Sequence, residues 1–438
     1  MTASRARGRT LPRRAGAASL LLALLLFLLS GAGPARAEDM PLNPSGEVAF
    51  RGNYWRDRNT RVLNPTVDLR QELPSGVGLQ ARYMLDAITS ASVAAGASSD
   101  RPFTELRHES GFGVEVPVGG KNRLSGSYSY STESDYWSHN AGLRAKLSFF
   151  QDNTSLLLGV DYGHNTVGKR LGPTGYLVQG TMQTVHAVVL ATQALSRTVL
   201  GTASYELTYA DGYMNNPYRP VWVNSERREV EKLPTTRLRH VVALSLHGML
   251  RTGNPTVSHV TLRPGLRIHA DSWALKAVNP ELAGYVQLGP VEVRGLLGYY
   301  RQWAVSFYRS ECSVAMGGFP GAPCYSDYGA EWGTRTDPTS GAVGPDYVYT
   351  SDVKLGDYAT YTWDLQIKWR LSFLAGSGFV GDRLSRSAVE LSGGMWFADR
   401  AVGNQFGIPL SSGDPSAPAG CSLTCGAGFA ALGWYVPL

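Results

Sequence analysis

Long hydrophobic runs are nearly absent from this chain of 438 residues. One apolar run occupies residues 15–29, and no second run of roughly 20 apolar residues follows it, although a membrane-spanning helix needs about that length. Charged residues are also scarce, at 17% of the chain. The scarcity of apolar runs excludes a membrane protein built from helices.

Without its N-terminal segment, the chain has no excess of basic residues over acidic ones. Six of the 41 Lys and Arg residues and none of the 35 acids precede Glu38, which leaves 35 basic and 35 acidic residues. The same segment combines a basic start, the apolar run and the small-x-small site Ala35-Arg36-Ala37, as secretory signals do. We therefore predict a cleaved signal peptide at 1–37, one domain at 38–438, and no nucleic-acid partner.

Motifs for metal, phosphate or nucleophilic chemistry are missing as well. The eight His residues show no H-x-x-x-H spacing, and no glycine-rich phosphate loop stands in a strand–helix context. Ser138-His139-Asn140 suggests a hydrolase, but adjacent residues of a strand point to opposite faces, so Ser138 and His139 cannot pair locally. We expect no enzyme, no catalytic residue, no metal and no cofactor.

The stretch 361–373 shows what is present instead. Its odd positions are all large and apolar, from Tyr361 to Phe373, and its even positions are all polar or charged. A period of two places each set on one face of a β-strand. Strands of soluble proteins usually have about 5–6 residues, whereas a strand that crosses a bilayer needs roughly 9–11. The stretch predicts a transmembrane strand between lipid and a wet lumen.

The same alternation recurs along the chain and predicts sixteen strands, within a range of fourteen to eighteen. They cover residues 48–55, 62–69, 77–86, 103–116, 123–132, 137–149, 156–162, 181–193, 199–209, 237–250, 257–268, 273–288, 291–308, 347–373, 388–397 and 426–438. Single-chain bacterial barrels have an even number of strands, so 347–373 is taken as one long strand bent near Gly356.

Connections between these strands alternate in length. Short turns at 74–76, 150–153, 195–197 and 252–255 would face the periplasm, and long loops at 89–99, 211–233, 309–346 and 399–425 would face outward. This sorting is typical of outer-membrane barrels. The predicted fold is therefore an all-β, antiparallel, up-and-down transmembrane barrel in the bacterial outer membrane, in contact with outer-membrane lipid.

Four cysteines form two close pairs. Cys312 lies near Cys324 in the chain, and Cys421 lies near Cys425. In an oxidising compartment we expect two disulfide-closed loops. The competing interpretation, a metal site, lacks a nearby His.

The chain ends at Leu438 rather than at the Phe or Trp that is common for outer-membrane barrels. Pro437, just before the end, also removes a donor from the strand ladder. We therefore expect the barrel-assembly machinery to read a variant signal.

Several local motifs resemble those of a bacterial outer-membrane family of unknown function. They are LDAITSAS (85–92), DGYMNNPYR (211–219), LPTTRLRH (233–240), DSW (271–273), GYYRQ (298–302) and YTSDVKL (349–355). The resemblance implies an outer-membrane barrel and no established substrate. It further implies small lipoproteins and a flavin-transferring enzyme as neighbours, and hence envelope redox chemistry.

These motifs supply charged residues near the predicted extracellular strand ends: Asp86, Arg219, Arg237, Arg239, Asp271, Arg301 and Asp352. One hypothesis is a charged network that constricts the barrel mouth, since rings of charge set the selectivity of pores. The other is that these residues pair with one another and pin the loops to the wall, as Arg–carboxylate networks do. The second hypothesis is favoured.

Two functions remain for a non-enzymatic barrel. A sixteen-strand wall is wide enough to enclose water, and the predicted lumen face at Ser125–Ser131 is small and polar. This favours a porin-like channel for small solutes. The alternative is a plugged structural or docking barrel that works with a periplasmic or lipoprotein partner.

Overall fold

The structure is a computed structural model of the chain. It describes residues 46–56, 60–90, 103–171, 175–218, 220–222, 228–254, 256–307, 350, 352–377, 381, 384–398 and 426–437. Among the helices in these ranges, none combines the length and apolarity needed to cross a membrane.

Two groups of sequence predictions fall outside the described residues. One is the signal peptide at 1–37 with its cleavage site. The other is the pair of disulfides, since none of the four cysteines belongs to the described ranges: Cys312, Cys324, Cys421 and Cys425. The bond between Cys312 and Cys324 and the bond between Cys421 and Cys425 therefore stay predictions.

Sixteen antiparallel strands close into one barrel. They are β1 (Gly46–Arg56), β2 (Thr60–Glu72), β3 (Gly78–Ser90), β4 (Phe103–Pro117), β5 (Arg123–Thr132), β6 (Tyr136–Phe149), β7 (Thr154–Arg170), β8 (Tyr176–Ala194), β9 (Val199–Gly212), β12 (Thr236–Arg251), β13 (Val257–Asp271), β14 (Lys276–Leu288), β15 (Val291–Trp303), β16 (Tyr358–Arg370), β17 (Ala388–Ala398) and β18 (Gly426–Pro437). Each strand pairs with its chain neighbours, and β1 pairs with β18 to close the wall. The predicted all-β barrel of sixteen strands is confirmed.

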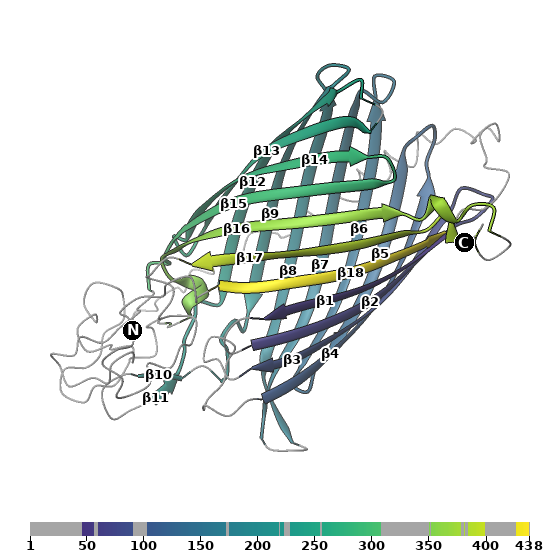
Figure 1. The fold of residues 1–438 in the computed structure, drawn as a ribbon. Helices are drawn as coiled ribbons and strands as arrows, with labels where there is room; N and C mark the ends of the chain where they lie inside the picture. The colour runs from purple at the N-terminus through teal and green to yellow at the C-terminus, as the bar shows by residue number, and fades with distance from the viewer. Residues whose placement is uncertain are drawn as a thin grey trace, which may run out of the picture.

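The two ends of the barrel differ in their connections (Figure 1). One end carries short turns, such as 73–77 and 289–290, together with the start of β1 and the end of β18. The other end carries the long connection 304–357 and the connection 213–235, which contains the small sheet of β10 (Pro220–Trp222) and β11 (Arg228–Val230). By the rule for bacterial barrels, the first end is periplasmic and the second extracellular.

Side chains alternate between a membrane face and a lumen face. On β16, Tyr361, Trp363 and Leu365 are exposed on the outside, and Thr362 and Asp364 line the lumen. The other strands repeat this arrangement, so the exposed large apolar side chains form an outer belt. A belt of this kind is stable only against lipid. The predicted alternation of 361–373 is confirmed as far as Arg370, where the strand ends.

Glycines shape two of the periplasmic turns. Gly76 has a φ of +77°, and Gly119 and Gly120 have φ values of +98° and +53°. Residues other than glycine rarely adopt a backbone conformation in this left-handed region. The Gly76 N–H donates to the Leu73 carbonyl over 2.8 Å and closes the first turn.

Several predicted strand boundaries are wrong. β7 continues to Arg170 rather than to Tyr162, and β8 begins at Tyr176 rather than at Thr181. The long strand at 347–373 is replaced by a 3₁₀ turn (Val353–Leu355) and by β16, which begins only at Tyr358. β15 ends at Trp303 rather than at Tyr308, and β14 begins at Lys276 rather than at Trp273. The apolar side chains beyond these limits leave the wall and pack together above the lumen, which the alternation alone does not reveal.

Candidate functional site

The lumen holds an open cavity of about 560 Å³ beside β1–β7. Small residues line it, including Gly111, Gly113, Ser127 and Ser129. They lie on the faces of β4 and β5 that point away from the exposed Phe112 and Tyr128. The lumen is therefore polar and leaves room for water along this side of the barrel.

Ion pairs cross from strand to strand along the same wall. Asp68 contacts Arg51 and lies 3.6 Å from Arg82. Further around the barrel, Asp161 lies 2.9 Å from Arg144 and 3.3 Å from Nδ1 of His186. Because these side chains are 26–49% exposed, each pair contributes only about 0–1 kcal/mol to stability. Their charges remain accessible to a solute in the lumen.

Close packing at Gly142 allows one of these pairs to lie flat against the wall. A Cβ atom added to Gly142 would come within 2.2 Å of Asp161 Oδ1. Any larger residue there would push Asp161 into the lumen. Glycine at this position therefore keeps the passage wide.

The lumen faces of β12 and β13 form a basic wall. Five arginines face inward on these two strands, opposite the exposed outer Leu244 and Leu266; they are Arg237, Arg239, Arg251, Arg263 and Arg267. Asp271 is the single acid on the same inward faces. The structure thus concentrates positive charge on one side of the lumen.

Only part of this basic wall is neutralised. Arg237 pairs with Asp271, and Arg263 pairs with Glu281 over 2.8 Å. Within the described ranges, Arg239, Arg251 and Arg267 form no ion pair, and Nε of Arg239 is buried without a hydrogen-bond acceptor. Arg251 is the last residue of β12, at the periplasmic end of the strand. Arg239 and Arg267 are therefore the unpaired charges that an anion meets further inside the lumen.

A second cavity, of about 460 Å³, lies at the extracellular mouth. Its floor includes the inward-facing Met182, Thr184 and Arg239, and its roof includes Tyr213 and Leu233 from the connection 213–235. This connection therefore folds inward over the lumen.

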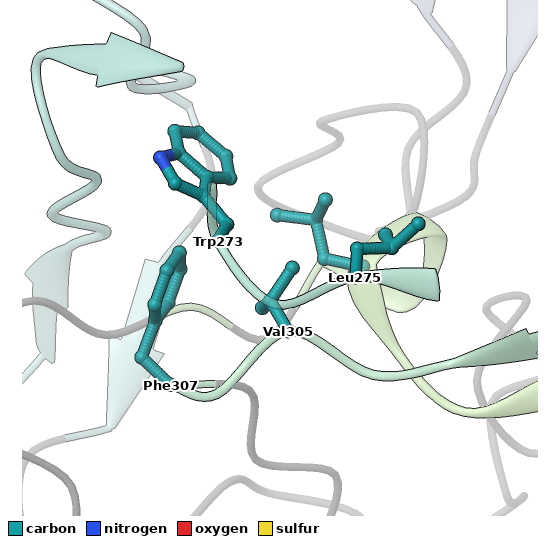
Figure 2. Close-up of a cluster of buried hydrophobic side chains, with 5 residues drawn as sticks. Trp273, Leu275, Val305 and Phe307 are labelled. Carbon is teal, nitrogen blue, oxygen red and sulfur yellow. The ribbon is translucent and has the colours of Figure 1, made fainter. Parts of the chain in front are cut away.

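A small hydrophobic core holds the roof together (Figure 2). Trp273 and Leu275 from the β13–β14 turn pack with Val305 and Phe307 that follow β15, and Leu355 completes the cluster. The Trp273 and Phe307 rings meet edge to face, with centroids 5.4 Å apart. Met214 and Leu233 pack against the outside of the cluster. We call the segments 213–218, 231–233, 272–275, 304–307, 350 and 352–357 the mouth cap.

Polar contacts tie the mouth cap together. Glu231 is 1% exposed; it accepts hydrogen bonds from the Thr350 hydroxyl over 2.7 Å and from the Asn216 N–H over 2.8 Å. The Tyr218 hydroxyl donates to Asp135 and accepts from the Arg170 N–H. The cap is thus anchored on both sides of the mouth, at the β5–β6 turn and above β13–β16.

Two acids at the edge of the mouth cavity sit in an unusual environment. Burial raises the pKa of Glu133 above its ordinary value, although Arg107 opposes the shift. Burial also raises the pKa of Asp135, and the neighbouring Glu105 adds to the effect. Both carboxyl groups are therefore protonated more readily than an exposed acid.

Asp271 anchors the cap to the barrel wall. Its side chain is fully buried, and it accepts hydrogen bonds from the N–H groups of Trp273 and Leu275, each over 2.9 Å, and from Arg237. The Arg237 guanidinium also lies 4.2 Å from the centre of the Trp273 ring, whose indole N–H donates to the Thr236 carbonyl. The Asp271 carboxylate and the Trp273 indole N–H thus both have hydrogen-bond partners.

Replacing this anchor is expected to destabilise the barrel. In Asp271→Ala the buried Arg237 charge and two N–H groups lose their acceptor, which costs about 3–5 kcal/mol. The measurement is the urea midpoint of reversible folding into vesicles. The control is Asp357→Ala, which removes a half-exposed partner of Arg301 and is expected to cost less than about 1 kcal/mol. Equal losses in the two variants would contradict the anchoring role.

The other charged residues that the sequence singled out lie apart from this corner. Asp352 lines the mouth cavity with Arg237 and Arg239. Asp86 accepts a hydrogen bond from Asn64 and lies 3.9 Å from Arg107 on the opposite wall. Arg301 faces outward, 2.5 Å from Asp357 and stacked on Trp303. Arg219 lies outside the described residues, so a network of all seven stays a prediction.

Ser138 and His139 point to opposite faces of β6, as expected. Ser138 accepts a hydrogen bond from Asn140 on the lumen side, and His139 bonds to Tyr128 on the membrane side. In the described part of the chain, no group of three or more His, Cys, Asp or Glu residues is placed to hold a metal ion.

Comparison with known sequences identifies the family. Residues 79–378 match the sequence model of "Protein of unknown function (DUF3570)". The chain belongs to this family. Its model covers most of the barrel, including β12 and β13, and all of the mouth cap. No curated protein matches the sequence.

Solved structures with similar architecture are outer-membrane proteins. A bacterial polysaccharide outer membrane secretin is 9% identical, with 90% of this chain and 98% of that chain covered and a TM-score of 0.45. The outer membrane protein OprD from Pseudomonas aeruginosa is 8% identical, with 92% and 96% covered and a TM-score of 0.40. OpdK from the same organism is 9% identical, with 90% and 99% covered and a TM-score of 0.39.

Proposed function

We propose that this protein is a channel in the bacterial outer membrane for the passive passage of small polar solutes. The observation that carries the proposal is the open, polar lumen cavity inside a closed wall of sixteen strands. Barrels of this strand number are wide enough to enclose an aqueous passage. The outer apolar belt supports the placement in a membrane.

The lumen lining supports passage rather than a packed interior. Serine occupies the inward positions of β5 that line the cavity, Gly111 and Gly113 lie opposite on β4, and glycine at 142 lets an ion pair lie against the wall. A structural barrel without a passage would fill these positions with large side chains, as small barrels do. Solute size is therefore set by the small inward residues and by the mouth cap.

A second candidate function is a barrel that the cap keeps closed until a partner acts on it. The packed core of the mouth cap and the buried Glu231 favour this candidate. The partner would be a periplasmic protein or a small lipoprotein, and the function would lie in the envelope, with a link to redox chemistry. The two candidates differ in whether the isolated barrel conducts.

Single-channel conductance of the refolded protein in a planar bilayer tests the proposal. We expect stable openings whose conductance increases with salt concentration. In the variant Ser127→Trp/Ser129→Trp, we expect this conductance to fall severalfold, because two indole rings would enter the lumen cavity. The matched control is Tyr128→Trp, since Tyr128 lies between the two serines and is 49% exposed on the outer face. A folded barrel that stays silent would reject the open channel and favour the second candidate.

A further inference from the structure

Three tyrosine–histidine pairs repeat on the membrane face of the barrel. The Tyr83 hydroxyl lies 2.8 Å from Nδ1 of His108, and Tyr128 and His139 form the same contact at the same distance. The third pair joins Tyr205 and His240, again over 2.8 Å. Each pair bridges two neighbouring strands: β3–β4, β5–β6 and β9–β12. Three copies of one geometry on the lipid-facing surface need an explanation beyond packing.

The histidines lie at one depth, near the extracellular border of the apolar belt. His139 is the direct cross-strand partner of a fourth outward histidine, His164. On each strand, four or five residues face outward between the histidine and the periplasmic end of the strand; Phe112, Leu143 and Leu244 are examples. For tilted strands this span is about 20–25 Å, close to the height of the apolar band of a membrane barrel. The imidazoles therefore meet the outer leaflet where hydrocarbon gives way to headgroups.

The hydrogen bond to tyrosine decides which ring nitrogen faces the membrane. In the described part of the chain, the hydroxyls of Tyr83, Tyr128 and Tyr205 have no hydrogen-bond partner other than these imidazoles. In the tautomer in which each hydroxyl donates its proton to Nδ1, the imidazole carries its own proton on Nε2. The outward-facing atom is thus an N–H donor, and leaving it unbonded at the edge of hydrocarbon would be costly.

We infer that the histidines 108, 139 and 240 form a binding belt for the phosphate groups of outer-leaflet lipids. Phosphate oxygens are strong acceptors and are present at the depth of the belt, and a donor bonded to an anion gains more than one bonded to a neutral group. The rings of the paired tyrosines flank each donor and suit the interface between hydrocarbon and headgroups. The inference rests on the outer-membrane placement, and it holds whether or not the lumen conducts.

Lipid retention in native mass spectrometry tests the belt. The full chain is refolded and placed in nanodiscs that contain phosphatidylethanolamine with diphosphoryl lipid A. We expect the protein to keep bound lipid A after release from the disc, and the variant His108→Phe/His139→Phe/His240→Phe to bind it about tenfold more weakly, because it loses charge-assisted hydrogen bonds. Replacing diphosphoryl by monophosphoryl lipid A is expected to weaken binding to the unmodified protein.

The matched control is His247→Phe/His259→Phe, which removes two imidazoles that face the lumen rather than the membrane. It is expected to retain lipid A like the unmodified protein. Heat modifiability on a gel verifies that each variant is folded; if the triple variant does not fold, His139→Phe alone is measured and a smaller loss is expected. Equal retention by the outward variants and the unmodified protein, or equal binding of both lipid A forms, would overturn the inference and leave the pairs a purely structural role.

Discussion

Neutralising Arg239 and Arg267 together is expected to abolish the preference for anions that the basic wall would give the proposed channel. In the unmodified barrel, these two guanidinium groups face the lumen from β12 and β13 without an acidic partner in the described part of the chain. The opposite wall carries arginines that are already matched by Asp68 and Asp161. An anion in the lumen therefore meets net positive charge on the side of β12 and β13. On the opposite side it meets a wall whose charges nearly cancel.

The size of this effect follows from Coulomb's law. In a wet lumen each unit charge a few Å from the ion path changes its energy by about 1 kcal/mol. Removing two charges in Arg239→Gln/Arg267→Gln changes the energy of the anion by about 2 kcal/mol, which is expected to reduce the anion-to-cation permeability ratio by about thirtyfold or more. The measurement is the reversal potential across a bilayer with a potassium chloride gradient.

The matched control for selectivity is Arg301→Gln. It removes the same charge, but Arg301 lies on the outer face beside Trp303 and Asp357. Its reversal potential is expected to equal that of the unmodified channel. An unchanged reversal potential in the double variant, or an equal shift in the control, would contradict the role of the basic wall.

Loosening the mouth cap is expected to lengthen channel openings severalfold and to raise their conductance. Glu231 joins the connection after β9 to the connection before β16 through Asn216 and Thr350. Glu231→Ala removes both hydrogen bonds and leaves two buried donors unpaired, which costs about 1–3 kcal/mol for each donor. Because only a few such contacts hold the cap closed, we expect the weakened cap to open more often and to stay open for longer.

The test compares Glu231→Ala with two other variants in the same bilayer measurement. Glu231→Gln keeps the shape of the side chain and one of its acceptors, so an intermediate effect is expected. Asp152→Ala changes an acid in a periplasmic turn, where it contacts Lys121 and Ser148 and not the cap, and it is expected to leave the openings unchanged. If Glu231→Ala opened no more often than Asp152→Ala, the cap would not control access to the lumen.

The sequence by itself determined the class of fold and the inside and outside of its wall. Strand alternation is a local property with a period of two, so the residues from Tyr361 to Trp369 could be assigned to faces without knowledge of their neighbours. The turns at Gly76 and Gly119 follow from local backbone preferences in the same way. The even strand count then followed from the rule that single-chain bacterial barrels have an even number of strands.

Only the tertiary structure decided where the strands stop and which charges meet. Trp273, Val305 and Phe307 continue the alternation of their strands, yet they leave the wall to form the core of the cap. Their partners come from separate connections that converge only when the barrel closes. The pairing of Arg237 with Asp271, the isolation of Arg239 and the outward tyrosine–histidine pairs likewise depend on register between strands. Register is a property of the closed sheet as a whole and is not readable from any one strand.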